Sequence, residues 1–316
     1  MAIFKDYLEN KSPLILHGAL GTEMESLGYD ISGKLWSAKY LLEKPEVIQK
    51  IHETYVAAGA DLITTSSYQA TLPGLIDAGL TKEEAEQIIA LTVQLAKNAR
   101  DKVWATLDET EKANRPYPLI SGDVGPYAAY LANGSEYTGD YGQITIEALK
   151  EFHRPRIQIL LDHGVDLLAL ETIPNYLEAQ ALIELLAEEF PEAEAYISFT
   201  VQEPGTISDG TSLDEIAQLV GQSDQILALG INCSSPLLYN QALAILKNAG
   251  KALITYPNSG EVYDGSTQTW KPKDKDALTL VEHSKDWHTQ FGVKILGGCC
   301  RTRPNDIKAL YAEFRT

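Results

Sequence analysis

Val293-Lys294-Ile295-Leu296-Gly297-Gly298-Cys299-Cys300-Arg301-Thr302-Arg303-Pro304 is the stretch of this 316-residue chain that decides its fold. It begins with a short apolar run of strand type, and two glycines then allow the backbone to turn sharply. Two adjacent cysteines follow, before a proline suited to opening a helix. The third cysteine of the chain, Cys233, follows a similar apolar run over 226–232. We therefore expect all three thiols to lie just beyond the ends of two strands.

Apolar runs of strand type alternate with helical patterns along the whole chain. We predict strands over 14–17, 62–66, 119–123, 166–171, 196–201, 226–232, 252–256 and 293–296, and helices over about 45–58, from 81, over about 145–161 and from 304. Eight strands, each followed by a helix, predict an α/β fold, namely a single (β/α)8 TIM-type barrel with eight parallel strands. An open doubly wound sheet is the alternative, but no Gly-x-Gly-x-x-Gly follows the first strand. No linker, low-complexity tract or short repeat interrupts the pattern, so we predict one domain over 1–316.

Composition and charge narrow the classes of partner. Hydrophobic residues make up 44% of the chain and charged residues 22%, which is typical of a globular protein with a full core. The formal net charge of −18 disfavours nucleic acid and anionic membrane surfaces as partners. No apolar run approaches the ~18 residues of a membrane span, and no signal peptide is visible. An odd number of cysteines, two of them adjacent, suits no disulfide framework. We expect a reduced, cytoplasmic protein that is a monomer or a small homo-oligomer.

Polar side chains gather where the predicted strands end. In barrels of this kind the active site lies at the C-terminal ends of the strands. The strand interiors here consist mainly of Leu, Ile, Val and Ala, so the polar residues predict a mouth at one end of the barrel. These strand ends are His17-Gly18, Thr65 to Tyr68, Asp123, Glu171-Thr172, Thr200, Asn232-Cys233, 257–261 and 297–300.

The cysteines narrow the chemistry at this mouth. One strand separates the sixth and eighth strands in a barrel, so a single ion at the rim can reach Cys233, Cys299 and Cys300. Thiolates select zinc over hard cations, and three protein ligands leave the fourth position open, as in catalytic zinc sites. Zinc lowers the pKa of a thiol, so the open position suits a substrate thiolate that attacks an electrophilic methyl group. Cysteines that serve as small buried apolar residues, or a vicinal disulfide, are the alternatives.

Several motifs together resemble the homocysteine S-methyltransferase family, in the branch that uses S-methylmethionine or S-adenosylmethionine. The resemblance covers nearly the whole chain and is most specific at the paired cysteines. It implies a zinc-bearing barrel that methylates homocysteine to methionine. The motifs are Gly297-Gly298-Cys299-Cys300 with Gly230-Ile231-Asn232-Cys233 upstream, Leu16-His17-Gly18-Ala19-Leu20-Gly21-Thr22-Glu23, Thr64-Thr65-Ser66-Ser67-Tyr68-Gln69-Ala70-Thr71, Leu170-Glu171-Thr172-Ile173-Pro174 and Tyr256-Pro257-Asn258-Ser259-Gly260-Glu261.

The resemblance also implies how the amino acid would bind. The family uses the position of Glu171 for the substrate ammonium, and an unpaired carboxylate at the end of an apolar strand would be costly to bury. The family usually has Asp where this chain has His17, which can keep a hydrogen bond but not the same charge. Backbone N–H groups of Gly18, Ala19 and Leu20 are suited to the substrate carboxylate, because glycine turns permit close approach.

Three further residues complete the predicted substrate site. Thr65 and Tyr68 lie at the end of the second strand, and Tyr68 either faces a sulfonium group through a cation–π contact or simply packs. Asn232 is expected to orient its loop rather than to touch the sulfur.

The sequence thus predicts a zinc-dependent methyltransferase. A methyl group would pass from a sulfonium donor, S-methylmethionine before S-adenosylmethionine, to homocysteine thiolate and give methionine. Two other classes remain open. A metal-dependent hydrolase or lyase on the same barrel would want His and Asp ligands around a metal-bound water. A non-enzymatic zinc or redox protein would use the thiols without turnover.

Overall fold

The computed structural model describes residues 3–31, 36–260, 262–264, 269–271 and 278–315. Its strands are β1 (Leu14–Ile15), β2 (Leu62–Thr64), β3 (Leu119–Val124), β4 (Leu167–Ile173), β5 (Ala195–Phe199), β6 (Ile226–Asn232), β7 (Ala252–Tyr256), β8 (Val262–Asp264), β9 (Thr269–Lys271) and β10 (Ile295–Leu296). Its α-helices are α1 (Ile3–Leu8), α2 (Leu20–Ser26), α3 (Lys39–Glu43), α4 (Pro45–Ala58), α5 (Leu72–Asp77), α6 (Lys82–Trp104), α7 (Glu109–Ala113), α8 (Tyr127–Leu131), α9 (Ile146–Asp162), α10 (Tyr176–Glu189), α11 (Leu213–Gly221), α12 (Tyr239–Leu246), α13 (Leu280–Phe291) and α14 (Pro304–Arg315). Short 3-10 turns are η1 (Trp36–Ala38), η2 (Ser135–Tyr137), η3 (Pro236–Leu238) and η4 (Lys247–Ala249).

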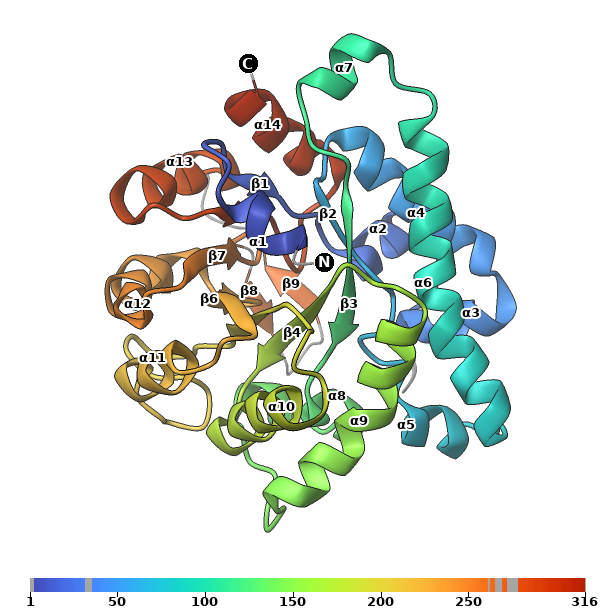
Figure 1. Ribbon diagram of the computed structural model, residues 1–316, viewed down its shortest axis with the longest axis vertical. Coiled ribbons are helices and arrows are strands. Elements are labelled where there is room, and N and C mark those ends of the chain that lie inside the picture. Colours follow the sequence, from blue (N-terminus) through green and yellow to red (C-terminus); the bar gives the residue numbers. More distant parts are fainter. Residues whose placement is uncertain (1–2, 32–35, 261, 265–268, 272–277, 316) are drawn as a thin grey trace.

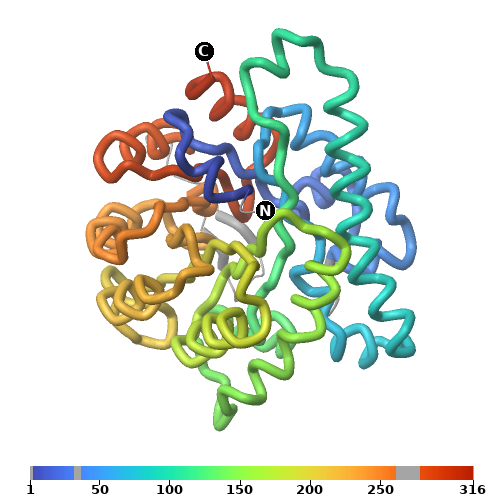
Figure 2. Tube along the Cα trace, viewed as in Figure 1, coloured from blue at the N-terminus to red at the C-terminus, as the bar shows by residue number. Residues whose placement is uncertain are grey.

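Eight parallel strands form a sheet that curls almost into a closed ring (Figure 1). The strand order is β1-β10-β7-β6-β5-β4-β3-β2, so the first and last strands of the barrel lie side by side (Figure 2). Between β1 and β2 the ring is completed by a parallel bridge from Leu16 to Leu62, and the His17 N–H donates to the Leu62 carbonyl oxygen at 3.2 Å. The predicted eight-stranded TIM-type barrel is confirmed. The antiparallel pair β8–β9 is an addition that the sequence pattern did not indicate.

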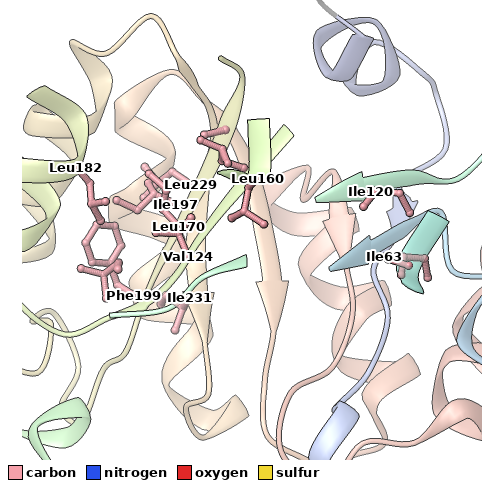
Figure 3. Packing of buried hydrophobic residues seen from close by; sticks show 14 of the residues in the cluster. Ile63, Ile120, Val124, Leu160, Leu170, Leu182, Ile197, Phe199, Leu229 and Ile231 are labelled. Atoms are coloured by element: carbon pink, nitrogen blue, oxygen red, sulfur yellow. The ribbon is translucent and has the colours of Figure 1, made fainter. Parts of the chain in front are cut away.

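The two faces of each strand pack against different partners. Inward-facing Leu14, Leu62 and Leu167 belong to one buried cluster, which also contains Phe4 of α1. The outward face packs against the surrounding helices in a second and larger cluster, part of which is shown in Figure 3. In Figure 1 helix α1 lies across one end of the strands. That end is therefore closed by apolar side chains, and polar side chains are left for the opposite end of the barrel.

The surrounding helices begin and end at clear sequence signals. Helix α6 starts after Thr81 with the predicted cap, because the Thr81 hydroxyl accepts from the Glu84 N–H while the Glu84 carboxylate accepts from the Thr81 N–H. Helix α4 ends at Gly59, whose φ of 106° suits a residue without a Cβ atom. In the described part of the chain, no helix combines the length and the apolar character that a bilayer crossing needs.

One glycine inside the barrel wall gives a test of the packing. Gly230 lies in β6 opposite Ile254 of β7, and a Cβ atom at this position would overlap the Ile254 carbonyl oxygen. We expect Gly230→Ala to lower the free energy of unfolding by about 3 kcal/mol, because neither backbone can move without breaking the sheet. Urea denaturation measures this change. The control is Gly221→Ala at the end of α11, where the nearest backbone atom would lie 3.1 Å away. Equal stability of the two variants would contradict this account.

Candidate metal centre and substrate site

The three cysteines come together at the C-terminal ends of β6 and β10. Cys233 directly follows β6, and Cys299 and Cys300 follow β10 after two glycines. The three sulfur atoms lie within 4.8 Å of one another, and those of Cys233 and Cys300 are 3.8 Å apart. All three side chains are half-buried. Among the residues that the structure describes, no imidazole or carboxylate joins this cluster, so the donor set consists of soft sulfur atoms.

Close backbone packing places the paired cysteines. A Cβ atom at Gly297 would lie 2.7 Å from the Cβ atom of Leu16, and one at Gly298 would overlap the Thr302 side chain. Neither glycine has a positive φ, so both are required for close approach rather than for a left-handed turn. The Cys299 N–H then donates to the Pro257 carbonyl oxygen at 2.7 Å. Cys233 has a φ of 47°, an uncommon conformation for a residue other than glycine.

The structure joins Cys233 and Cys299 in a disulfide and leaves Cys300 as a free thiol. The prediction that the cysteines would form no disulfide was wrong, because the convergence that lets three sulfurs share an ion also brings two of them within bonding reach. Disulfide sulfurs carry no thiolate charge, so the three-sulfur metal site exists only in the reduced protein. Burial raises the pKa of the Cys300 thiol to about 11. A nearby cation is therefore needed to make this residue a thiolate at neutral pH.

Glu171 lies on β4, next to the end of this strand at the same mouth. Its Oε2 atom accepts a hydrogen bond from the Tyr256 hydroxyl at 3.1 Å, and the Tyr256 hydroxyl also bonds with the Ser198 hydroxyl. Burial raises the pKa of Glu171 to about 7. The carboxylate would regain its charge if a cation bound beside it. Glu261, at the end of the motif that begins with Tyr256, lies outside the described residues.

Asn232 connects the Glu171 strand to the Cys233 strand. It is fully buried, its Oδ1 atom accepts from the Thr172 N–H at 3.1 Å, and its Nδ2 atom donates to the Thr172 hydroxyl at 2.8 Å. Thr172 has a φ of 64°, so these bonds hold an otherwise unfavourable turn directly after Glu171. Both polar atoms of the Asn232 side chain are engaged within the protein, which agrees with an orienting role.

The turn after β1 carries His17 and the three predicted backbone donors. The Ala19 N–H donates to the Thr302 carbonyl oxygen at 3.3 Å, whereas the N–H groups of Gly18 and Leu20 have no acceptor among the described residues. The His17 Nδ1 atom lies against the Gly18 carbonyl oxygen, and its buried Nε2 atom has no hydrogen-bond partner there. Burial lowers the pKa of His17 to about 4. His17 is therefore neutral at physiological pH and supplies no charge.

The two residues predicted at the end of β2 have different surroundings. The Thr65 hydroxyl accepts from the Asp123 N–H at 2.9 Å and bonds with the Ser67 hydroxyl at 2.8 Å, so it serves the protein itself. The Tyr68 ring packs so closely on Gly125 that a Cβ atom there would lie 2.6 Å from it. The Tyr68 hydroxyl interacts with the Thr172 side chain, and burial raises its pKa.

Two buried charged residues at this mouth were not assigned from the sequence. Asp123 was recognised as a strand end, but no role followed from that position alone. Arg156 lies within α9, and nothing in a helical pattern signals its function. Its guanidinium donates to the carbonyl oxygens of Tyr68 at 3.1 Å and Gly125 at 2.5 Å. Arg156 thereby holds the loops that follow β2 and β3.

Comparison with known proteins agrees with this geometry. The family described as "Homocysteine S-methyltransferase" matches residues 14–314. Homocysteine S-methyltransferase YbgG of Bacillus subtilis (strain 168) is 45% identical over 305 residues, which cover 96% of this chain and 95% of the relative. The crystal structure of the Escherichia coli homocysteine methyltransferase MmuM in its metallated form superimposes with a TM-score of 0.85 at 41% identity, over 98% of each chain. The oxidised form of MmuM gives a TM-score of 0.84 at 41% identity, over 97% of each chain.

The matches extend over almost the whole barrel, including the strand ends that carry Cys233, Glu171 and the paired cysteines. They confirm the resemblance inferred from the motifs and, together with the three converging thiols, indicate a metal site. The chain belongs to the homocysteine S-methyltransferase family and is a methyltransferase.

Proposed function

We propose that the protein methylates homocysteine with a sulfonium donor, S-methylmethionine before S-adenosylmethionine, and that its metal is zinc. The observation that carries this proposal is the convergence of three sulfurs from β6 and β10 at a mouth that also holds Glu171. A hydrolase or lyase is not favoured, because the described residues add no imidazole or carboxylate to the sulfur cluster.

Zinc fits the donor set formed by Cys233, Cys299 and Cys300. The three cysteines in their reduced form would hold the ion, and the substrate sulfur would be its remaining ligand. When bound, zinc would lower the pKa of the homocysteine thiol so that the substrate is present as a thiolate at neutral pH.

The surrounding residues are suited to hold the amino acid portion of homocysteine. Glu171 would bind the ammonium group, and the available N–H groups of Gly18 and Leu20 would bind the carboxylate. Ala19 completes this turn, and neutral His17 can contribute a hydrogen bond through its unpartnered Nε2 atom.

The other predicted residues support these groups. Asn232 and Thr65 act through the backbone that they hold, namely Thr172 after Glu171 and Asp123 on β3. The half-buried Tyr68 ring beside the same mouth would offer an aromatic face to the sulfonium group of the donor.

Methyl transfer then needs no proton at the reacting carbon. An electron pair of the homocysteine thiolate forms the new S–CH3 bond, the C–S bond of the sulfonium breaks, and its electron pair stays on the donor sulfur. With S-methylmethionine, both products are methionine. The protein contributes position and desolvation, because a sulfonium is already activated toward attack.

We further propose that the barrel over 1–316 acts as one functional domain, as a monomer or a small homo-oligomer. We place it in the cytoplasm, because an open cluster of three thiolates requires a reducing compartment.

Turnover with a labelled donor tests the proposal. Reduced, zinc-loaded protein incubated with homocysteine and S-[methyl-²H]methylmethionine is expected to form labelled methionine from both reactants, as measured by mass spectrometry. Omitting homocysteine is expected to abolish product formation, and oxidised protein is expected to be inactive until a thiol reductant is added. A zinc or redox protein without enzymatic function would bind metal but give no methionine with any sulfonium donor. That result would defeat the proposal.

A further inference from the structure

Asp123 is a buried acid that faces the barrel interior and has no assigned task. It is 4% exposed and lies near the end of β3. Its neighbour Gly122 faces α9, since a Cβ atom there would contact Leu160 at 3.2 Å. Because successive strand residues point to opposite faces, the Asp123 side chain points inward. The Asp123 Oδ1 atom has no hydrogen-bond partner among the described residues.

The backbone of Asp123 is held so that this orientation is fixed. Its N–H donates to the Thr65 hydroxyl at 2.9 Å, and its carbonyl oxygen accepts from the Ser67 hydroxyl at 2.7 Å. Both backbone polar groups of Asp123 are therefore hydrogen-bonded, whereas the Oδ1 atom of its carboxyl group has no partner among the described residues. A buried carboxyl group with one unpartnered oxygen costs stability, so its retention at the mouth calls for a ligand.

Glu171 is the immediate neighbour of Asp123. Asp123 pairs with Ala169 in the sheet register, and Glu171 follows two residues later on the same face of β4. The two carboxyl groups interact directly, and burial together with this neighbour raises the pKa of Asp123. No Lys, Arg or His of the described chain forms an ion pair with either acid. The Arg156 guanidinium attracts the Asp123 carboxylate but forms no ion pair with it. Its two terminal nitrogens donate to carbonyl oxygens and bond with His153, whereas its Nε atom has no hydrogen-bond partner among the described residues.

Buried Asp123 and half-buried Glu171 lie next to each other without an ion-pair partner in the described chain, and two such acids form a site for a cation from outside. Homocysteine carries such a group, because its amino group is an ammonium ion at neutral pH. We propose that Asp123 is a second carboxylate for the amino group of homocysteine, so that Glu171 and Asp123 receive the ammonium between them. This inference rests on the proposed function. The family usually has an Asp at the position of His17, whereas His17 is neutral here. Asp123 on β3 would supply the negative charge that is missing at the end of β1.

The side chain of homocysteine makes the arrangement consistent with the thiol site. Three carbon atoms separate its amino nitrogen from its sulfur, so both ends fit into one mouth. Asn232 links the two ends, because it precedes Cys233 on β6 and bonds with Thr172 after Glu171. Asp123 would thus be a substrate-positioning residue rather than a participant in methyl transfer.

The test compares acceptors with and without the amino group. Asp123→Asn keeps the shape of the side chain but removes its charge, and 4-mercaptobutanoate is homocysteine without its amino group. We expect Asp123→Asn to raise KM for homocysteine about 10- to 100-fold, the usual effect of losing a charged hydrogen bond. We expect little change in kcat, in KM for the donor, in zinc content or in turnover of 4-mercaptobutanoate. The preference for homocysteine over the analogue should therefore fall by the same factor.

The control variant is Asp166→Asn, at the opposite end of β4, where the carboxylate accepts from the Ile120 N–H. It should affect both acceptors equally. An equal loss on both acceptors in folded, zinc-loaded Asp123→Asn, or an unchanged KM for homocysteine, would overturn the inference. Should Asp123→Asn fail to fold, Asp123→Ser serves the same comparison.

A binding measurement separates this inference from the proposed function. Calorimetry with L-methionine and with its des-amino analogue 4-(methylthio)butanoate needs no turnover. Wild type should prefer L-methionine, and the Asp123 variant should lose about tenfold or more of that preference. If wild type forms no methionine, the proposed function fails while this measurement still decides the role of Asp123. An unchanged preference in the variant would refute that role.

Discussion

Cys300→Ser is expected to lose its bound zinc and at least about 10³-fold of kcat/KM for homocysteine while the barrel remains folded. A serine hydroxyl is a hard and weakly acidic donor, so it does not replace a thiolate in a soft site. The fold is kept because the strands are held by backbone ladders and by two apolar clusters, neither of which depends on an ion. Metal analysis measures the zinc content, circular dichroism shows whether the barrel is folded, and the labelled-methyl assay measures kcat/KM.

The matched control for this variant is Arg303→Lys in the same loop, where the side chain contacts Glu23 at 3.0 Å and lies half-exposed. It is expected to keep zinc and activity. Wild-type zinc content and turnover in folded Cys300→Ser would remove the basis for assigning the metal to these three thiols.

Glu171→Gln is expected to lower kcat/KM for homocysteine at least about 10²-fold, mainly through KM, and to make the protein more stable at pH 8. The stability gain follows from the raised pKa of Glu171, which burial moves from 4.5 to about 7. Between these two values the folded wild type binds a proton that the unfolded chain does not, so its stability falls as the pH rises. The glutamine variant carries no such penalty and should gain roughly 1–3 kcal/mol above pH 7, with little difference near pH 4.

Urea denaturation at pH 4, 6 and 8 measures this trend. The control is Glu184→Gln, since the Lys150 ammonium at 2.9 Å lowers the pKa of the Glu184 carboxyl. That variant should lose stability at neutral pH rather than gain it. A Glu171→Gln protein that is less stable than wild type at pH 8 would show that this carboxyl group has a structural role.

Periodicity and turn residues predicted the barrel because they act locally. Each predicted strand is present, and the helix at Pro45–Ala58 begins and ends where its apolar face and Gly59 indicated. The meeting of Cys233 with the cysteine pair followed from strand order alone. The fold could therefore be predicted from the alternation of strand and helix patterns and from the residues at which helices begin and end.

The finer features of the site depend on pairings between distant residues. Whether the Thr65 hydroxyl faces a ligand or the Asp123 N–H is decided by the sheet register, which no local pattern reports. The disulfide between Cys233 and Cys299 depends on which two of three sulfurs approach each other. The role inferred for Asp123 could not be predicted from the sequence, because it depends on the neighbours of this residue. Burial and the Glu171 carboxyl group make a negative charge on Asp123 unfavourable.

The narrow join between β1 and β2 has a consequence for motion. In the described chain these strands share one bridge, from Leu16 to Leu62, whereas β6 and β7 are paired from Ala228 to Asn232. Local opening of the ring costs least at such a seam, so amide hydrogens there should exchange with solvent before those of β6 or β7. Gly18 and Leu20 lie beside this join. A substrate carboxylate held by their N–H groups would therefore slow the local opening between β1 and β2.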